Sequence, residues 1–370
     1  MAPAFVLGLV AALAFGVSIG SFLNVVIYRV PRGESVSSPT WSYCPNCHTR
    51  LIGWDLVPIF SFLFLGTKCR YCKKPISWRY LTVETITGVL FAGLFCTYGW
   101  HIETVAYCLF AAVLVAAFFI DLDYFIIPDE LNVLGVGFGI ALNIAHYWTG
   151  DPPARWTIGP VHILASIGSA VVCALLFHLI SLVGYLYYTR RGAGGPVDVG
   201  ADAEPAPSVF TKIGWFTVGI LDDFGFLLAK FCGLGFVFPG IRRWIDAHEV
   251  IDEPEAASLP DQAVPSGTVK TREEIAQEIE SDEEQTGMGQ GDAKLAAAIG
   301  SVLLLKMALL SIFVAIVLGG IVSVVLLVTG RRGGRSAIPF GPYLVAGTLI
   351  VLFTGTHLLD WYLLYAFPAR

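Results

Sequence analysis

Two acids in this chain stand beside long apolar runs, where a carboxylate is costly unless it has a function or a partner. Asp292 lies in GMGQGDAKL and is followed by an apolar run, whereas Asp121 begins DLDYFIIPD and follows the run AAVLVAAFFI. If the fold brings the two carboxylates together, they cannot both ionise cheaply, so one keeps its proton beside the other's charge. Such a pair can activate a water molecule and protonate a leaving amine, which is the chemistry of aspartic peptide hydrolysis.

The residues around Asp292 are predicted to form a supporting active-site turn, because glycine lets a backbone approach a partner or an extended substrate closely. Near Asp121, Asp123 is the alternative catalytic acid, and Asp129 follows a proline and is better explained as a helix cap. The supporting turn consists of Gly287, Gly289, Gly291 and Lys294.

Four cysteines form a second motif, CPNC followed by CRYC. Each CxxC pair can place two thiolates on one tetrahedral ion, and two pairs complete a closed shell. Because a closed shell leaves no position for substrate, the zinc ion predicted here is structural, and four free thiols are the alternative. The predicted ligands are Cys44, Cys47, Cys69 and Cys72.

Membrane helices must position these groups. The chain of 370 residues is 55% hydrophobic and 14% charged, with a mean hydropathy of +0.70, whereas soluble domains are about 25% charged. We therefore expect an all-α, polytopic transmembrane bundle with a small four-cysteine loop domain. Eight spans are predicted, and the sixth and seventh could form one broken unit. Their approximate ranges are 4–27, 82–98, 104–120, 131–148, 161–186, 295–306, 308–329 and 341–360.

The distribution of Lys and Arg predicts the orientation. Segment 28–80 holds eight of these bases against two acids, and the loop at 330–337 holds three more. The positive-inside rule places both segments in the cytoplasm, the N-terminus outside, and Asp121 and Asp292 at the cytoplasmic face. The predicted divisions are the first span (1–27), the zinc-binding loop domain (28–81), spans 2–5 (82–186), a cytoplasmic linker and acidic insert with a possible interfacial helix pair (187–286), and the GxGD motif with spans 6–8 (287–370).

Several ordered blocks resemble the bacterial type IV prepilin peptidases, a family of GxGD membrane aspartyl proteases. The resemblance implies Asp121 and Asp292 as the catalytic pair, since the family's first catalytic Asp precedes the proline of its motif by seven positions. It also implies a location in the bacterial inner membrane and cleavage of the basic leader of type IV prepilins or of type II secretion or competence pseudopilins. No nucleic acid is involved. The blocks are GSFLNVVIYRVPRGES, the cysteine tetrad, RYLTVETITGVLF, DLDYFIIPDELN, GMGQGDAKLAAAIG and IPFGPYL.

The same resemblance implies a second activity, methylation of the new amino terminus with S-adenosylmethionine. It is associated with the cytoplasmic loop, so Gly33 and Glu34 of RGES are methyl-transfer candidates. No glycine-rich nucleotide motif supports a methyl-donor site independently. A basic leader would favour a nearby acidic surface, for which Asp123, Asp129 or Glu84 are available, although Glu84 is equally explained as an interfacial acid.

Two other functions are compatible with parts of the pattern. One is a GxGD protease of the presenilin or signal-peptide-peptidase kind, but those enzymes pair GxGD with a Tyr-Asp motif, and Asp121 follows Ile120. The other is a transporter or scaffold with a structural zinc loop, which predicts acids at mid-bilayer and internal repeats. A third possibility is that the protein only methylates, in which case cleavage should survive the loss of Asp121 and Asp292.

Overall fold

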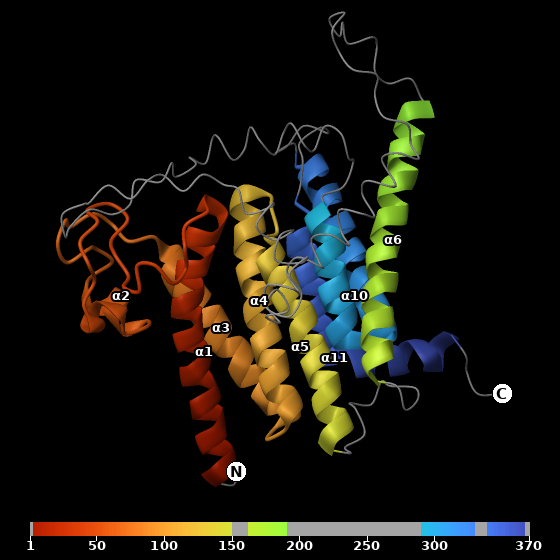
Figure 1. The fold of residues 1–370 in the computed structure, drawn as a ribbon, viewed down its shortest axis with the longest axis horizontal. Helices are drawn as coiled ribbons and strands as arrows, with labels where there is room; N and C mark the ends of the chain where they lie inside the picture. The colour runs from red at the N-terminus through yellow and green to blue at the C-terminus, as the bar shows by residue number, and fades with distance from the viewer. Residues whose placement is uncertain (1–2, 150–161, 191–289, 330–338, 367–370) are drawn as a thin grey trace, which may run out of the picture. The chain divides into compact units, whose positions relative to one another are not determined.

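The structure is a computed structural model that describes residues 3–149, 162–190, 290–329 and 339–366. Within these ranges the chain is helical, and its only β-pairing is two isolated bridges in the loop that follows the first helix. Figure 1 shows the helices. They are α1 (Pro3–Arg29), η1 (Val30–Arg32), η2 (Gly53–Leu56), α2 (Phe60–Phe64), α3 (Trp78–Tyr98), α4 (Ile102–Tyr124), α5 (Asp129–Thr149), α6 (His162–Arg190), α10 (Gln290–Val328) and α11 (Gly341–Ala366).

Six of the described helices, α1, α3, α4, α6, α10 and α11, are long and apolar enough to cross a membrane. The 21-residue helix α5 packs against α4 and α10 and completes the bundle. The eight predicted spans correspond to these seven helices, since the sixth and seventh both lie in α10. The predicted all-helical membrane bundle is confirmed.

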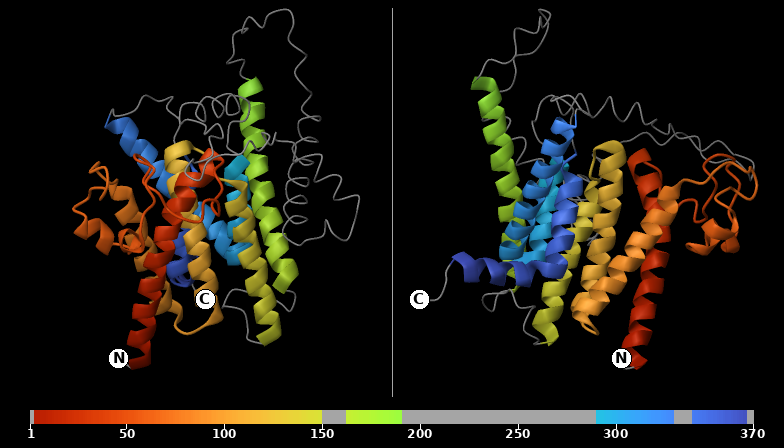
Figure 2. Two further views of the ribbon diagram at one scale, coloured as in Figure 1. Left: turned by 60° about the vertical axis from the view of Figure 1, so that its left-hand side comes forward. Right: turned by 180° about the vertical axis from the view of Figure 1, so that it is seen from behind.

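Helix α10 consists of two limbs joined by a sharp reversal. Its backbone leaves helical geometry at Leu304, where φ is 60° and ψ is 167°. At the start of the first limb, Gly291 lies against the turn between α4 and α5. The second limb runs back along α11, so that Met307 lies beside the later part of α11 and Gly319 lies beside Tyr343 in its first turn. Figure 2 shows the limbs from two further sides. The predicted broken unit is therefore a helical hairpin.

Helices α1 and α3 approach each other closely through glycines. A Cβ atom on Gly20 would lie 2.7 Å from the Cα atom of Glu84, and one on Gly16 would lie 2.9 Å from the Cα atom of Gly88. Small residues at such positions let membrane helices pack with their backbones in contact. This packing fixes Glu84 against α1.

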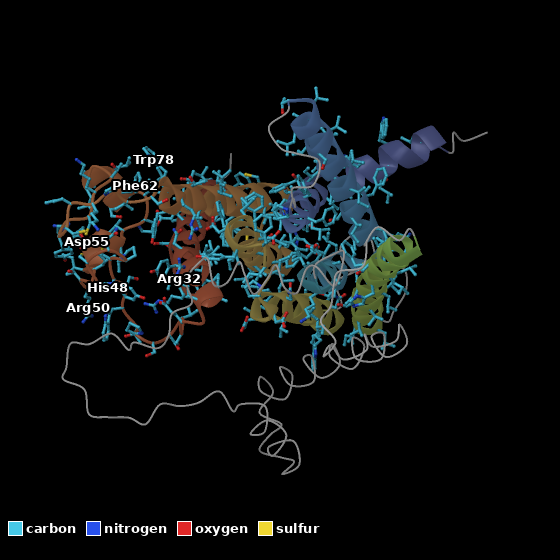
Figure 3. All side chains as sticks on the ribbon, turned by 90° about the horizontal axis from the view of Figure 1, so that it is seen from above. Arg32, His48, Arg50, Asp55, Phe62 and Trp78 are labelled. Carbon is cyan, nitrogen blue, oxygen red and sulfur yellow. The ribbon has the colours of Figure 1, made fainter. Side chains whose placement is uncertain are left out.

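The segment 30–77 between α1 and α3, here called the cysteine loop, holds little regular structure. Arg29 anchors it to the end of α1, because its guanidinium donates hydrogen bonds of 2.9–3.1 Å to the carbonyl oxygens of Ser35, Val36, Pro39 and Trp41. Figure 3 shows Phe62 of the loop beside Trp78, whose ring centroid is 5.1 Å away. The loop is thus attached to the bundle at both of its ends.

Several predictions lie outside the described residues. They concern most of the insert at 187–286, including its interfacial helix pair, and also Gly287 and Gly289 of the supporting turn. Helix α6 continues to Arg190, a few residues into the predicted linker.

Candidate functional site

The four predicted cysteine ligands meet in the cysteine loop. All four Sγ atoms lie within 4.8 Å of one another, and those of Cys44 and Cys72 are 3.9 Å apart. In a tetrahedron with Zn–S bonds of about 2.3 Å, the sulfur atoms are about 3.8 Å apart. The cluster therefore fits a zinc ion, and its four sulfurs leave no open position.

The two CxxC pairs have the same local geometry. In each, the amide of the first cysteine donates to the carbonyl five residues later, from Cys44 to Thr49 at 3.0 Å and from Cys69 to Lys74 at 2.9 Å. The residue after each second cysteine, His48 or Lys73, has a positive φ of 54° or 60°. The backbone therefore turns back after each pair and directs its two thiols to one point, which makes two matching knuckles.

The thiols of the cluster differ in acidity. Hydrogen bonds from Thr49 lower the pKa of Cys47 to about 6, whereas burial raises the pKa of Cys44 to about 11. Backbone hydrogen bonds from Cys72 lower the pKa of Cys69. At neutral pH the cluster therefore offers at least one thiolate, and a bound cation would drive the remaining thiols to ionise.

The second knuckle is held by Asp55, a buried acid of η2. Its carboxylate accepts from the Arg70 Nε atom at 2.7 Å and from the Tyr71 hydroxyl at 3.3 Å. Figure 3 shows Asp55 in the loop together with His48 and Arg50. Asp55 therefore connects the 3-10 turn to the CxxC pair that contains Arg70 and Tyr71.

Asp121 lies in the last turn of α4 and is only 5% exposed. The helix ends at Phe125, which has a φ of 59° and donates its amide to the carbonyl of Asp121 at 2.9 Å. Across from it, a Cβ atom on Gly341 would lie 2.5 Å from the Asp121 Oδ2 atom. The start of α11 therefore packs directly on this carboxylate.

Asp292 lies in the first turn of α10 and is 8% exposed. Its neighbour Gly291 packs on Ile127, since an added Cβ atom would lie 3.1 Å from the Cβ atom of Ile127. Ile127 also borders Gly341, at 3.1 Å from its Cβ position to the Ile127 Cδ1 atom. The structure therefore brings the end of α4 and the starts of α10 and α11 together around Ile127. We call Asp121, Asp292, Ile127, Gly291 and Gly341 the acid site.

Two further acids near this site pair with bases of the same chain. Asp129 accepts two hydrogen bonds from the Lys294 ammonium, at 2.9 and 2.7 Å, which ties the first turn of α5 to that of α10. Asp123 forms an ion pair with Arg79 at the start of α3. Asp123 and Asp129 therefore each connect two helices of the bundle.

The methyl-transfer candidates lie where α1 passes into the cysteine loop. Gly33 has a φ of 69° and ends η1, and Glu34 accepts a hydrogen bond of 2.8 Å from the Tyr43 hydroxyl. Burial, followed by this bond to Glu34, raises the pKa of Tyr43 to about 12. Tyr43 in turn lines a cavity of about 300 Å³ between α1, α3 and the cysteine loop. That volume lies at the lower end of the range for small-molecule sites.

Gly341 and Ile127 were not recognised as site residues from the sequence. Gly341 lies in IPFGPYL, and its signal is a glycine at the start of an apolar helix. Ile127 is one of two adjacent isoleucines before Pro128 and carries no signal of its own. Their positions depend on which helix ends meet.

The fold and site together define a multi-pass helical membrane protein with two buried aspartates at converging helix ends and a four-cysteine site beside the bundle. Residues 14–98 match the model of the bacterial peptidase A24 N-terminal domain, and residues 276–324 match that of the type IV leader peptidase family. These matches, together with the relatives described next, show that the chain is similar to the type IV leader peptidase family.

Curated relatives carry the name prepilin leader peptidase/N-methyltransferase. The one from Myxococcus xanthus is 36% identical over 48% of this chain and 50% of its own length. The one from Neisseria gonorrhoeae is 36% identical over 36% of this chain and 54% of its own. The one from Legionella pneumophila is 23% identical over 95% and 93%. The chain thus spans about half the length of the first two relatives, and no solved structure matches it.

Proposed function

We propose that this protein is a membrane aspartyl endopeptidase that removes the basic leader peptide of type IV prepilins or pseudopilins. The observation that carries the proposal is the acid site, where Asp121 and Asp292 are both buried at helix ends that meet around Ile127. The names of the relatives support the substrate class. Two neighbouring acids, Asp123 and Asp129, form ion pairs with Arg79 and Lys294.

In the proposed mechanism the two carboxylates share one proton. The ionised carboxylate takes a proton from a water molecule, which attacks the carbonyl carbon of the scissile peptide bond. The protonated carboxyl group then gives its proton to the leaving amine, so that the pair returns to a singly protonated state after the products separate. The roles of the two acids are interchangeable at this level of description.

The site suits a substrate that consists of a basic leader and one apolar helix. Such a substrate stays in the bilayer until cleavage, so the active site must reach the scissile bond at the membrane–water interface. The basic cysteine loop adjoins the bundle at the start of α3, and the positive-inside rule places this end in the cytoplasm. Cleavage is therefore proposed at the cytoplasmic face, with the N-terminus of the chain outside.

The same protein is proposed to methylate the new amino terminus with S-adenosylmethionine, and the four cysteines are proposed to hold a structural zinc ion. The relatives' N-methyltransferase name and the cavity beside Tyr43 support the first statement. The separation of the four Sγ atoms supports the second. When bound, zinc would fix the two knuckles on one centre.

The decisive test replaces each acid of the pair by its amide in full-length protein reconstituted in lipid. We expect Asp121→Asn and Asp292→Asn each to lower the rate of prepilin cleavage by about 10²–10⁴-fold, because each removes a proton-transfer group. Cleavage is followed by mass spectrometry of the released leader.

Asp123→Asn is the matched control, two residues from Asp121, and should keep cleavage within a few-fold of wild type. Retention of full activity by Asp121→Asn together with its loss in Asp123→Asn would transfer the role to Asp123. A folded wild-type protein that cuts no prepilin would refute the proposed peptidase.

A further inference from the structure

The cavity between α1, α3 and the cysteine loop contains a buried acceptor without a partner. Asn24 is 4% exposed and lines the cavity. Its amide nitrogen donates to the carbonyl of Tyr80 at 3.2 Å, but within the described residues its Oδ1 atom accepts no hydrogen bond. A buried acceptor left unpaired costs free energy, so Asn24 is adapted to a donor that the chain does not supply.

A buried carboxylate lines the same cavity. Glu84 is 7% exposed, and it accepts hydrogen bonds from the backbone amide of Ile59 at 2.7 Å and from the Ser21 side chain. Among the described residues, no ion pair joins Glu84 to a lysine, arginine or histidine. A charge buried in this way is costly unless a cation meets it.

Three bases line the cavity, Arg29, Arg70 and Lys74, and the two arginines are engaged elsewhere. The guanidinium of Arg29 is occupied by four backbone carbonyls of the cysteine loop, and that of Arg70 by Asp55. The carboxylate of Glu84 and the Oδ1 atom of Asn24 are therefore two acceptors of the cavity that neither arginine engages, whereas the carboxylate of Asp55, which also lines it, is paired with Arg70. Its remaining lining includes apolar side chains such as Val25, Leu56 and Phe62.

The chemistry of these groups selects the ligand. A primary ammonium group carries a positive charge for Glu84 and several N–H donors, one of which can satisfy the Asn24 oxygen. A sulfonium centre has charge but no N–H donor. The apolar lining suits the apolar residues that follow the ammonium at the start of a peptide.

Aromatic contacts connect this cavity to the acid site. Tyr28 lines the cavity, and the guanidinium of Arg32 lies 4.0 Å from the centroid of its ring. The same guanidinium lies 5.6 Å from the ring of Tyr124, three residues beyond Asp121 on α4. One side chain, Arg32, therefore contacts both a residue of the cavity and a residue of the α4 end that carries Asp121.

We infer that Asn24 and Glu84 bind the free amino terminus of the cleaved substrate in this cavity, and that Glu84 takes a proton from it before methylation. The inference rests on the proposed methyltransferase function. The proton passes from the ammonium nitrogen to the carboxylate, which leaves a neutral amine. The amine lone pair then forms the new N–C bond to the methyl carbon, while the carbon–sulfur bond of the sulfonium donor breaks and its electron pair stays on sulfur.

A binding experiment tests the inference apart from catalysis. Full-length protein in lipid nanodiscs is titrated with two fluorescent peptides that share the apolar start of a mature pilin, one with a free amino terminus and one acetylated. Wild type should bind the free amine at least about 10-fold more tightly, because a charge-assisted contact is lost on acetylation. Glu84→Gln, which keeps an acceptor for Ile59, should abolish this preference, and Asn24→Leu should reduce it.

Glu103→Gln is the matched control, since it neutralises another helix acid, at the start of α4, which lies 3.4 Å from the Nε2 atom of His146. It should keep the preference of wild type. Equal binding of both peptides by wild type that still cleaves prepilin would overturn the inference while leaving the proposed peptidase intact. An undiminished preference in Glu84→Gln would overturn it as well.

The amino group that occupies the cavity could come from the cleaved peptide or from the methyl donor. Binding of S-adenosylhomocysteine distinguishes these two sources, because this product of the donor carries an amino group of its own. Its affinity should be the same in wild type and Glu84→Gln. A loss of its binding in Glu84→Gln, with the peptide preference unchanged, would assign the two groups to the methyl donor and overturn the inference. In methylation assays Glu84→Gln should lower transfer by about 10-fold or more while prepilin cleavage stays within a few-fold of wild type.

Discussion

The cysteine loop and the acid site achieve order by different means. In the cysteine loop, four ligands from a stretch of 29 residues meet through two local turns of equal geometry. In the acid site, three helix ends from residues 121, 291 and 341 meet, although long parts of the chain separate them. The loop is therefore organised by the spacing of its cysteines and by two local turns, and the acid site by helix packing.

This difference indicates how each region should fail. A local metal site depends on one ion for its folding free energy, so the site should unfold almost completely when the ion is removed. A site made from packed helix ends is supported by the whole bundle, so a single change displaces groups by small distances without unfolding them. Catalysis is sensitive to such displacements.

The largest expected effect follows removal of the metal. Cys44→Ser with Cys69→Ser should remove zinc and unfold the cysteine loop, because structural zinc contributes about 10–16 kcal/mol in small domains. Metal content by mass spectrometry should fall to zero, and limited proteolysis should cut within 36–77 while the helical circular dichroism of the bundle remains. Cys96→Ser, at an exposed cysteine of α3, is the control and should change neither. A cysteine loop that stays protease-resistant without zinc would show that the ion is not structural.

An intermediate effect is expected at the start of α11. Gly341→Ala places a methyl group at 2.5 Å from the Asp121 Oδ2 atom, so either this carboxylate or α11 must shift. Prepilin cleavage should fall by about 10–100-fold, with helix content and zinc content unchanged. Gly137→Ala on α5 is the matched control, because nothing lies within 4 Å of its Cβ position. Equal activity of the two variants would show that Gly341 does not constrain the acid site.

The smallest effect is expected from the ion pair between α5 and α10. Lys294→Met should reduce cleavage by a few-fold and lower the free energy of unfolding by about 1 kcal/mol or less, since the Asp129 side chain is 41% exposed. A double-mutant cycle of Lys294→Met and Asp129→Asn, measured by cleavage rates, should give a coupling between the two side chains that is also a few-fold in rate. Lys306→Met, at an exposed lysine of the same helix, is the control. A loss as large as that of Asp292→Asn would give Lys294 a direct role in the reaction.

The sequence was sufficient for features that depend on local order. The CxxC spacing predicted that the four cysteines meet at one point, and hydropathy predicted the helices and the interruption near Lys306. The resemblance selected Asp121 over Asp123 as the catalytic acid, and this choice stays a prediction.

Features that depend on contacts between distant segments were not predictable in the same way. The contact of Gly341 with Asp121 and the pairing of Lys294 with Asp129 require the register of helices far apart in the chain. The αL residues His48 and Lys73 complete the knuckles, but neither residue type signals a positive φ. Glu84 could be explained equally as an interfacial acid, and its place in a cavity that Asn24 also lines was not predictable from the sequence.

The reversal at Leu304 has a consequence for the surrounding lipid. The limb from Gln290 to Leu303 is about 21 Å long at 1.5 Å per residue, whereas the hydrocarbon core of a bilayer is about 30 Å thick. Because of this hydrophobic mismatch, the turn and the exposed Lys306 stop within the hydrocarbon core, short of the headgroups of the opposite leaflet. They reach those headgroups only if the bilayer thins or the lysine side chain extends toward them. The acyl-chain length of the membrane thus acts on the same helix that carries Asp292.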